Sequence, residues 1–445
     1  RELIRVEARY NKDINGHFIC DRGRFGFGFA NHGDRPRQAR IRGDAATYED
    51  ALQTAAERLS AISKSAGSDA IACAASSRSS VETQMGLKLL ARALGWRRPV
   101  YFMDRLQQDK VSAAIGRLDP DLAISLREVE QADAILLSGA DPIQEAPLLA
   151  LAMRQAQRAG AKVVVLGPDP IFLPFEYEHR PLATADPDSA VRELLQNSRR
   201  PVIVCGTDIA GLSAITAAAD LASALQADNK RPGLFYVLPG ANAYGAAIAS
   251  DGGESFSELL GAIENGKIKA LLLVETDPLY HFPDPERVKN ALGKLELLVV
   301  MDYLANRTIA FIGQTSAAME DAAPMHLMIP TLTHFETLSS FINQEGRLQR
   351  ATPVHANGMP LTQLTGGNHP PREFRNDIPG AGAKAAWQIL SELEAAISSS
   401  HSAVFSFHDL WSRIAPELNM DVHIENSAEI PDNLCIYPEN TNREL

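Results

Sequence analysis

The chain has 445 residues, of which 45% are hydrophobic and 22% charged, and its formal net charge is -12 at pH 7. This composition is typical of a globular protein with several domains and a large core. The negative charge argues against nucleic-acid binding, because a duplex-binding surface needs an excess of clustered Lys and Arg. The sequence has no apolar run approaching the roughly 18 residues of a membrane span, so we expect no direct membrane insertion.

The first informative stretch, 15–42, places Cys20 before a run of small, cationic and aromatic residues. In such company backbone amides can approach a thiolate closely, which makes Cys20 a candidate metal ligand; an ordinary half-buried thiol is the alternative. We expect the arginines of this stretch to form a solvated or subunit-facing surface rather than an anion site: Arg22, Arg24, Arg35, Arg37, Arg40 and Arg42.

The other three cysteines, Cys73, Cys205 and Cys435, are far apart in the sequence and form no CxxC pair. This spacing fits a reducing compartment rather than a disulfide scaffold. Cys73 and Cys205 lie in apolar runs and are expected to be buried.

The spacing of apolar residues predicts a helix over 48–64, a strand over 69–75 and a helix over 81–94. Ser79 and Glu82 have capping-box spacing, and Gly95 is a plausible helix stop. The serine-rich turn between the strand and the second helix is typical of an anion site, because free backbone N–H groups face it. An ordinary βα loop is the alternative.

Two segments, 132–167 and 268–302, share one pattern of strand, Asp-Pro, helix, glycine and strand. Both are of βαβ length, and their nearly continuous apolar strands suit parallel sheets that are covered on both faces. With further strands at 201–205 and 233–238, they predict two nucleotide-fold-like α/β domains facing each other across a cleft.

The pattern changes after residue 323, where we expect a short apolar run, a helix-like patch and a polar turn around 343–346. An extended loop over 351–382 and helices over 383–398 and 407–414 follow, with a polar tail at the end. The eleven histidines form no metal-binding motif. Asp141 and Asp277, each before a proline, are interpreted as turn residues. No catalytic residue is assigned.

Several segments together resemble the molybdopterin oxidoreductase family. They are CDRGRF from Cys20, SSRSSVETQMGLKLLARALG from Ser76, IKALLLVETDP from Ile268 and FETLSSFINQEGRLQR from Phe335. In that family the cysteine matching Cys20 is the fourth ligand of an iron–sulfur cluster, whose other ligands form an upstream CxxCxxxC run. The resemblance therefore implies a [4Fe-4S] cluster held by Cys20 and by cysteines outside this sequence, and it indicates that the chain is a fragment.

Three departures from the family pattern concern the cofactor cleft. Gln107 stands where active members carry a molybdenum-binding side chain, and a neutral amide replaces a soft thiolate poorly. The family's I-D-P-R string becomes residues 166–169, which places Asp169 where a cofactor phosphate would be repelled, and its P-G-T-D turn is replaced over 183–190. These departures imply that no molybdopterin binds.

A molybdopterin fold without its cofactor resembles the large iron–sulfur subunit of NADH-quinone oxidoreductases, which ICDRGRFGF and NQEGRLQ match in particular. The resemblance implies a non-catalytic domain that supports electron transfer from NADH to quinone. Its partners would be the other subunits of a membrane-associated complex, on the cytoplasmic side of the membrane or in the mitochondrial matrix. The alternatives are an active enzyme of the formate dehydrogenase type and a scaffold without any cofactor.

The expected fold class is α/β, with two doubly wound, Rossmann-like parallel-sheet domains and a small iron–sulfur module. We expect the end of that module over 1–45, a first α/β domain over 46–118 and 255–350, and a second over 119–254. The loop, helices and tail occupy 351–445.

Overall fold

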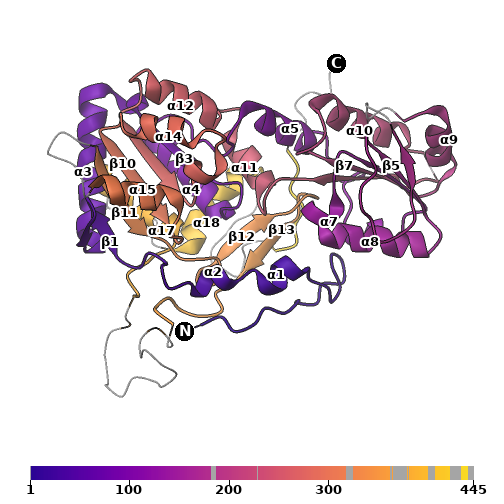
Figure 1. Ribbon diagram of the computed structural model, residues 1–445, viewed down its shortest axis with the longest axis horizontal. Helices are drawn as coiled ribbons and strands as arrows, with labels where there is room; N and C mark the ends of the chain where they lie inside the picture. Colours follow the sequence, from indigo (N-terminus) through magenta and orange to yellow (C-terminus); the bar gives the residue numbers. More distant parts are fainter. Residues whose placement is uncertain are drawn as a thin grey trace.

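The computed structural model describes residues 2–181, 187–227, 229–316, 324–360, 363, 378, 380–398, 406–420 and 432–438. Residues 183–186 of the replaced turn, most of the predicted extended loop and the last residues of the polar tail lie outside the described residues. Figure 1 shows two α/β units side by side, with the amino-terminal segment running along their lower edge.

The first unit is built on a six-stranded sheet with the strand order β2-β1-β11-β10-β9-β3. Four strands are parallel: β3 (Ile71–Ala75), β9 (Ala270–Val274), β10 (Leu297–Asp302) and β11 (Met325–Pro330). A hairpin of β1 (Ala39–Ile41) and β2 (Asp44–Ala46) adds an antiparallel edge to β11. Every residue of β3, β9 and β10 is buried, as expected for strands covered on both faces.

Helices cover both faces of this sheet because alternate strand residues point to opposite sides. One face packs against α12 (Phe256–Glu264), α14 (Pro285–Leu292) and α15 (Arg307–Ser316). The other face packs against α3 (Tyr48–Ala66), α4 (Val81–Leu94) and α17 (Ala386–Ser398). The short helices η1 (Ser68–Ala70) and α13 (Pro278–His281) lie in its connections, and α18 (Phe407–Glu417) packs on α4.

The second unit is a five-stranded parallel sheet with the order β6-β5-β4-β7-β8. Its strands are β4 (Ala134–Ser138), β5 (Lys162–Leu166), β6 (Glu178–Arg180), β7 (Pro201–Gly206) and β8 (Gly233–Val237). Because the chain builds outward from β4 in both directions, the sheet is doubly wound, as predicted. Around it lie α6 (Leu126–Val129), α7 (Pro142–Glu145), α8 (Pro147–Arg158), α9 (Ser189–Asn197) and α10 (Leu212–Ala224).

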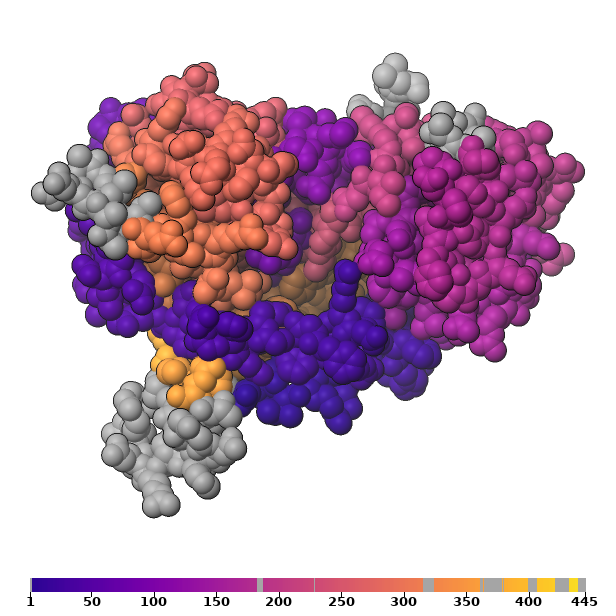
Figure 2. All heavy atoms as spheres, in the orientation of Figure 1, coloured from indigo at the N-terminus to yellow at the C-terminus, as the bar shows by residue number. Residues whose placement is uncertain are grey.

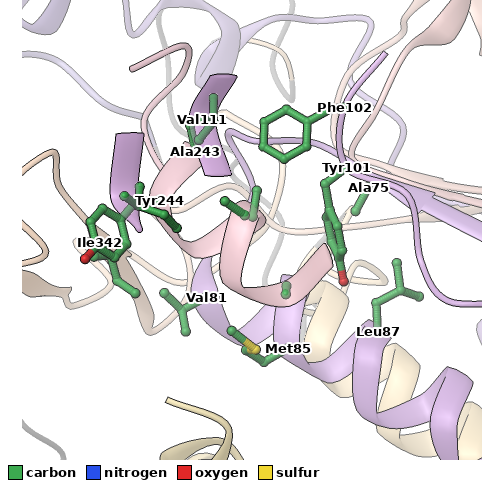
Figure 3. Close-up of a cluster of buried hydrophobic side chains, with 14 of the residues drawn as sticks. Ala75, Val81, Met85, Leu87, Tyr101, Phe102, Val111, Ala243, Tyr244 and Ile342 are labelled. Carbon is green, nitrogen blue, oxygen red and sulfur yellow. The ribbon is translucent and has the colours of Figure 1, made fainter. Parts of the chain in front are cut away.

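A shared apolar core joins the two units. Figure 3 shows Val81, Met85 and Leu87 of α4 near residues of three other elements. These elements are α5 (Arg105–Ile115), α11 (Ala243–Ser250) and the strand β12 (Ser339–Ile342). Since α11 follows the second sheet and α4 follows β3, this contact fixes the units relative to each other.

The prediction of a helix-like patch after residue 323 is wrong. The chain forms an antiparallel hairpin of β12 with β13 (Leu348–Ala351). Side chains from distant helices satisfy the free edge of β12: the Ser340 N–H donates to the Glu82 carboxylate, and the Ile342 N–H donates to Asn242 Oδ1, both at 2.9 Å. These partners favour a strand because they accept backbone N–H groups that a helix would use internally.

The predicted capping box of Ser79 and Glu82 is also wrong. Ser80 is the N-cap of α4, and its Oγ accepts from the Thr83 N–H at 3.2 Å. Glu82 is fully buried and is used in tertiary contacts instead. The predicted stop at Gly95 is confirmed, because Gly95 adopts the left-handed conformation at φ 68°.

The amino-terminal segment lies beneath β12 and β13 and carries two short helices, α1 (Asp21–Phe25) and α2 (Gly28–Asn31) (Figure 1). It is fixed to the first unit by Arg35, whose side chain is buried against Glu336. The prediction that all six arginines of this stretch form a solvated or subunit-facing surface is therefore wrong for Arg35. Arg22, Arg40 and Arg42 are exposed, whereas Arg37 is half-buried and donates to the Gly358 carbonyl.

Candidate functional site

A cleft of about 520 Å³ lies where loops of the two units meet, at the hollow between the orange and magenta halves in Figure 2. Its walls come from the carboxyl ends of β3, β8 and β9 and from the start of α5. The polar residues that line it are Ser76, Ser77, Arg78, Asp104, Gln107, Ser257, Thr276 and His281. The predicted cleft at the strand ends is therefore present, with the serine-rich turn and Gln107 on its wall.

Gln107 lies in the first turn of α5, where its N–H donates to the Asp104 carboxylate at 2.8 Å. Both side chains line the cleft, so the position predicted to replace a metal ligand presents an amide beside a carboxylate. The Asp104 carboxylate disfavours an anion beside Gln107, while the Arg78 guanidinium lies elsewhere in the same cleft wall. Asp169 is exposed after β5 and is not among the residues that line the cleft.

The serine-rich turn is held by a buried amide network. Asn242 Nδ2 donates to the Ser79 carbonyl at 2.8 Å and to Gln84 Oε1 at 2.9 Å. Gln84 Nε2 donates in turn to the Ser76 carbonyl at 3.0 Å. Because Asn242 follows the second sheet, this network sets the shape of the cleft and ties the two units together. Of the two predictions for the turn, the ordinary βα loop with its own N-cap matches this geometry.

Two buried carboxyl groups lie at the strand ends beneath the cleft. Glu275 follows β9 with a left-handed φ of 50°, and burial raises its pKa to about 8, with the charge of Asp302 adding to the shift. Asp302 ends β10, and burial raises its pKa to about 6. Sequence reasoning missed both residues, although an acidic residue directly after a fully apolar strand is a visible signal.

Cys20 is the N-cap residue of α1, and its Sγ accepts from the Gly23 N–H at 3.4 Å. The half-buried thiol lines a second cavity of about 320 Å³, which includes Glu145, Tyr244 and Asn343. Gly240 lines both this cavity and the cleft, so the two spaces adjoin. A half-buried thiolate with an N–H donor suits one corner of an iron–sulfur cluster.

The other cysteines do not gather around Cys20. Cys73 and Cys205 are buried, as predicted, and burial raises the pKa of each to about 12. Cys435 is half-buried, and burial raises its pKa as well. Within the described part of the chain, no group of three or more His, Cys, Asp or Glu side chains is arranged to hold a metal ion. Among the described residues, Cys20 is therefore a candidate for one ligand and not part of a ligand group.

The switch point of the second sheet, between β4 and β7, is filled by backbone. A Cβ added to Gly206 would lie 2.0 Å from the Gly139 carbonyl oxygen, and one added to Gly139 would lie 2.5 Å from Ala210 Cβ. Doubly wound sheets usually bind ligands at this point. Here the strand ends are in contact, whereas the cleft and the Cys20 cavity are open spaces near the interface of the two units.

The predicted turn residues Asp141 and Asp277 both lie in turns, as N-cap residues of α7 and α13. The carboxylate of Asp141 accepts from the N–H groups of the following turn. That of Asp277 reaches across to the start of α15 and accepts from the Thr308 hydroxyl at 2.6 Å. Among the histidines, His281 is exposed in the cleft wall, His326 is buried, and His334 packs against Phe335.

The family model described as molybdopterin oxidoreductase matches residues 40–359, which include both sheets and the cleft. The chain belongs to the molybdopterin oxidoreductase family. This membership agrees with the predicted fold class, and the solved structures agree as well. Acetylene hydratase from Pelobacter acetylenicus superposes with a TM-score of 0.54 at 12% identity, covering 93% of this chain and 68% of that one. A chain of the formyltransferase/hydrolase complex from Methylorubrum extorquens superposes with a TM-score of 0.53 at 16% identity, covering 81% of this chain and 99% of that one.

Among curated members of the family, the chain is similar to the G subunit of NADH-quinone oxidoreductase. The protein of Shigella flexneri is 30% identical over 80% of this chain and 43% of its own length. The protein of Pseudomonas putida is 30% identical over 78% of this chain and 42% of its own length. The chain thus spans about two fifths of the length of these relatives. The predicted resemblance to the large subunit of NADH-quinone oxidoreductases is confirmed at this level.

Proposed function

We propose that this chain is the cofactor-free molybdopterin-fold portion of the large iron–sulfur subunit of an NADH-quinone oxidoreductase. In this role it performs no bond-making chemistry. It supports electron transfer from NADH to quinone by contributing one cluster ligand and surfaces for other subunits. The similarity to NADH-quinone oxidoreductase subunits over four fifths of the chain supports this function.

The observation that carries the proposal is the contrast between Cys20 and Gln107. The Cys20 thiol is half-buried and accepts an N–H bond, which fits the fourth ligand of a [4Fe-4S] cluster whose other ligands lie outside this sequence. The cluster would supply one-electron transfer. Gln107 presents an amide beside the Asp104 carboxylate, which fits neither molybdenum nor the phosphates of a molybdopterin cofactor.

Partners and location follow from the same proposal. The chain would contact other subunits of the complex and lie at the membrane surface through them, on the cytoplasmic or matrix side. Among the described residues, no helix is long and apolar enough to cross a bilayer. We also propose that the domain boundaries lie at residues 45, 118, 254 and 350.

Metal analysis of the complete protein tests the function. We expect iron and acid-labile sulfide in the ratio of iron–sulfur clusters and no stoichiometric molybdenum. Stoichiometric molybdenum, or formate-dependent turnover by the purified protein, would instead support an active enzyme of the formate dehydrogenase type. A complete protein without iron would support a scaffold.

A further inference from the structure

A small cavity of about 30 Å³ shares Arg78 with the cleft, and we call it the inner cavity. It is bounded by the β3–α4 loop, the ends of β9 and β10, the β12 hairpin and α17. The residues that line it include Arg78, Glu275, Ser339, His334 and Trp387. A void of this size has room for water but for no organic ligand.

Three polar groups in its wall have no hydrogen-bond partner among the residues that the structure describes. They are Ser339 Oγ, Trp387 Nε1 and Arg78 Nε. Ser339 and Trp387 are 2% and 5% exposed, so bulk water does not satisfy them. Buried polar atoms of folded proteins are almost always paired, and ordered water is the usual partner when protein groups are missing.

Glu275 places a carboxyl group in the same wall, and the residue is 7% exposed. Arg78 faces it from the β3–α4 loop, Asp302 and Tyr303 from the end of β10, and His334 from the segment before β12. Burial lowers the pKa of His334, which favours its neutral form. Two carboxyl groups beside one guanidinium make the inner cavity a poor site for an anion.

The chemistry of one water molecule matches these groups. Water accepts two hydrogen bonds and donates two, and the wall offers the N–H donors of Trp387 and Arg78 with the oxygens of Ser339 and Glu275. We propose that the inner cavity is a hydration site whose water bridges these four groups, and that Glu275 is a proton-binding residue reached from the cleft past Arg78. This inference is independent of the proposed electron-transfer role, which uses neither Glu275 nor Trp387.

A high-resolution crystal structure of the complete protein, with a crystal soaked in bromide, tests the occupant. We expect ordered water within hydrogen-bonding distance of Trp387 Nε1 and Ser339 Oγ, and no anomalous bromide signal there. An empty cavity would overturn the hydration site, and bound bromide would show that the cavity takes an anion instead.

Infrared titration tests proton binding. We expect a protonated carboxyl band in the wild type that disappears with a midpoint at about pH 8 and is absent from Glu275→Gln. An unchanged band in that variant would overturn the assignment.

Trp387→Phe removes one donor to the water, so the carboxylate is stabilised less and the midpoint of the carboxyl band should rise. Trp411→Phe, which removes a buried indole N–H that donates to Glu82, is the matched control. Equal midpoints in Trp387→Phe and the wild type would show that the water does not affect the protonation of Glu275. This comparison does not need Glu275→Gln, so it remains decisive even if that variant does not fold.

Discussion

Arg35 and Glu336 form a buried ion pair with two parallel hydrogen bonds. Nη2 lies 2.6 Å from Oε2 and Nη1 lies 3.2 Å from Oε1, and the two side chains are 2% and 1% exposed. Burial raises the pKa of Glu336, but the hydrogen bonds and charge of Arg35 outweigh it and hold the pKa below its ordinary value. The pair joins the segment that carries Cys20 to the first α/β unit.

Arg35→Met should destabilise the protein by about 3–5 kcal/mol, because it leaves the Glu336 carboxylate buried without its partner. The free energy of unfolding in denaturant measures this loss. Arg22→Met, at an exposed arginine of the same segment, is the control and should change stability by about 0.5 kcal/mol or less. The double variant Arg35→Met with Glu336→Gln should recover part of the loss. Equal stabilities of the Arg35 and Arg22 variants would contradict the structural role of the pair.

If Cys20 is a cluster ligand as proposed, Cys20→Ser in the complete protein should remove or alter the signal of one [4Fe-4S] cluster in electron paramagnetic resonance, because a hydroxyl would replace the proposed thiolate ligand. Iron content should fall while the fold is kept, since the Cys20 Sγ makes one long hydrogen bond. Cys435→Ser is the control, as its thiol is also half-buried. The ligand assignment fails if both variants give the wild-type spectrum.

Much of the fold was predictable because its signals are local. The two βαβ repeats have nearly continuous apolar strands, and Asp-Pro follows the first strand of each; the structure places β4, β5, β9 and β10 within them. The errors arise where a distant partner decides the structure. Glu82 has capping-box spacing in the sequence, but its carboxylate is taken by Trp411, 329 residues away. In the sequence Arg35 resembles a surface arginine, but in the structure it is buried in an ion pair with Glu336, which is 301 residues away.

The candidate site could be predicted only in part, because distant partners also decide some of its structure. The family resemblance placed Gln107 at the cofactor cleft, and the serine-rich turn could be expected there because it follows a strand whose carboxyl end faces the cleft. The inner cavity could not be predicted, since its wall combines Arg78, Glu275, Ser339 and Trp387 from four separate elements. The packing of α17 against the first unit adds Trp387 to this wall.

Gly206→Ala should destabilise the protein by about 1–3 kcal/mol or more, because the new Cβ would lie 2.0 Å from the Gly139 carbonyl oxygen. Thermal or denaturant unfolding measures the change. Gly261→Ala in α12 is the matched control, since its Cβ would meet nothing within 4 Å and alanine favours a helix by up to about 1 kcal/mol. If the two substitutions had the same effect, the strand ends at the switch point would not be in contact.

Glu82→Ala should cost about 2–5 kcal/mol, because it leaves the Ser340 N–H and Trp411 Nε1 buried without an acceptor and opens a cavity. Trp411→Phe removes one donor and keeps the ring, so its cost should be smaller. Denaturant unfolding gives both values. Proteolysis of the α18 region should also increase in Glu82→Ala, since this bond ties α18 to α4. Wild-type protection there would contradict that role.

Glu275 should make the folded protein less stable as pH rises. Its folded pKa of about 8 lies above the ordinary value of 4.5, so between these values the folded state keeps a proton that the unfolded chain has released. The free energy of unfolding should therefore fall by at most about 1.4 kcal/mol per pH unit through this window and level off above it.

The glutamine variant separates this contribution from that of other groups. Glu275→Gln cannot release a proton, so its unfolding free energy should lose this part of the slope, while Glu57→Gln, at an exposed position on α3, should keep the wild-type profile. Unfolding curves at a series of pH values measure the difference. Parallel profiles for Glu275→Gln and the wild type would mean that Glu275 is already ionised in the folded protein at neutral pH. Arg78 would then have to stabilise the buried charge, and Arg78→Gln should destabilise the protein more at alkaline than at acidic pH.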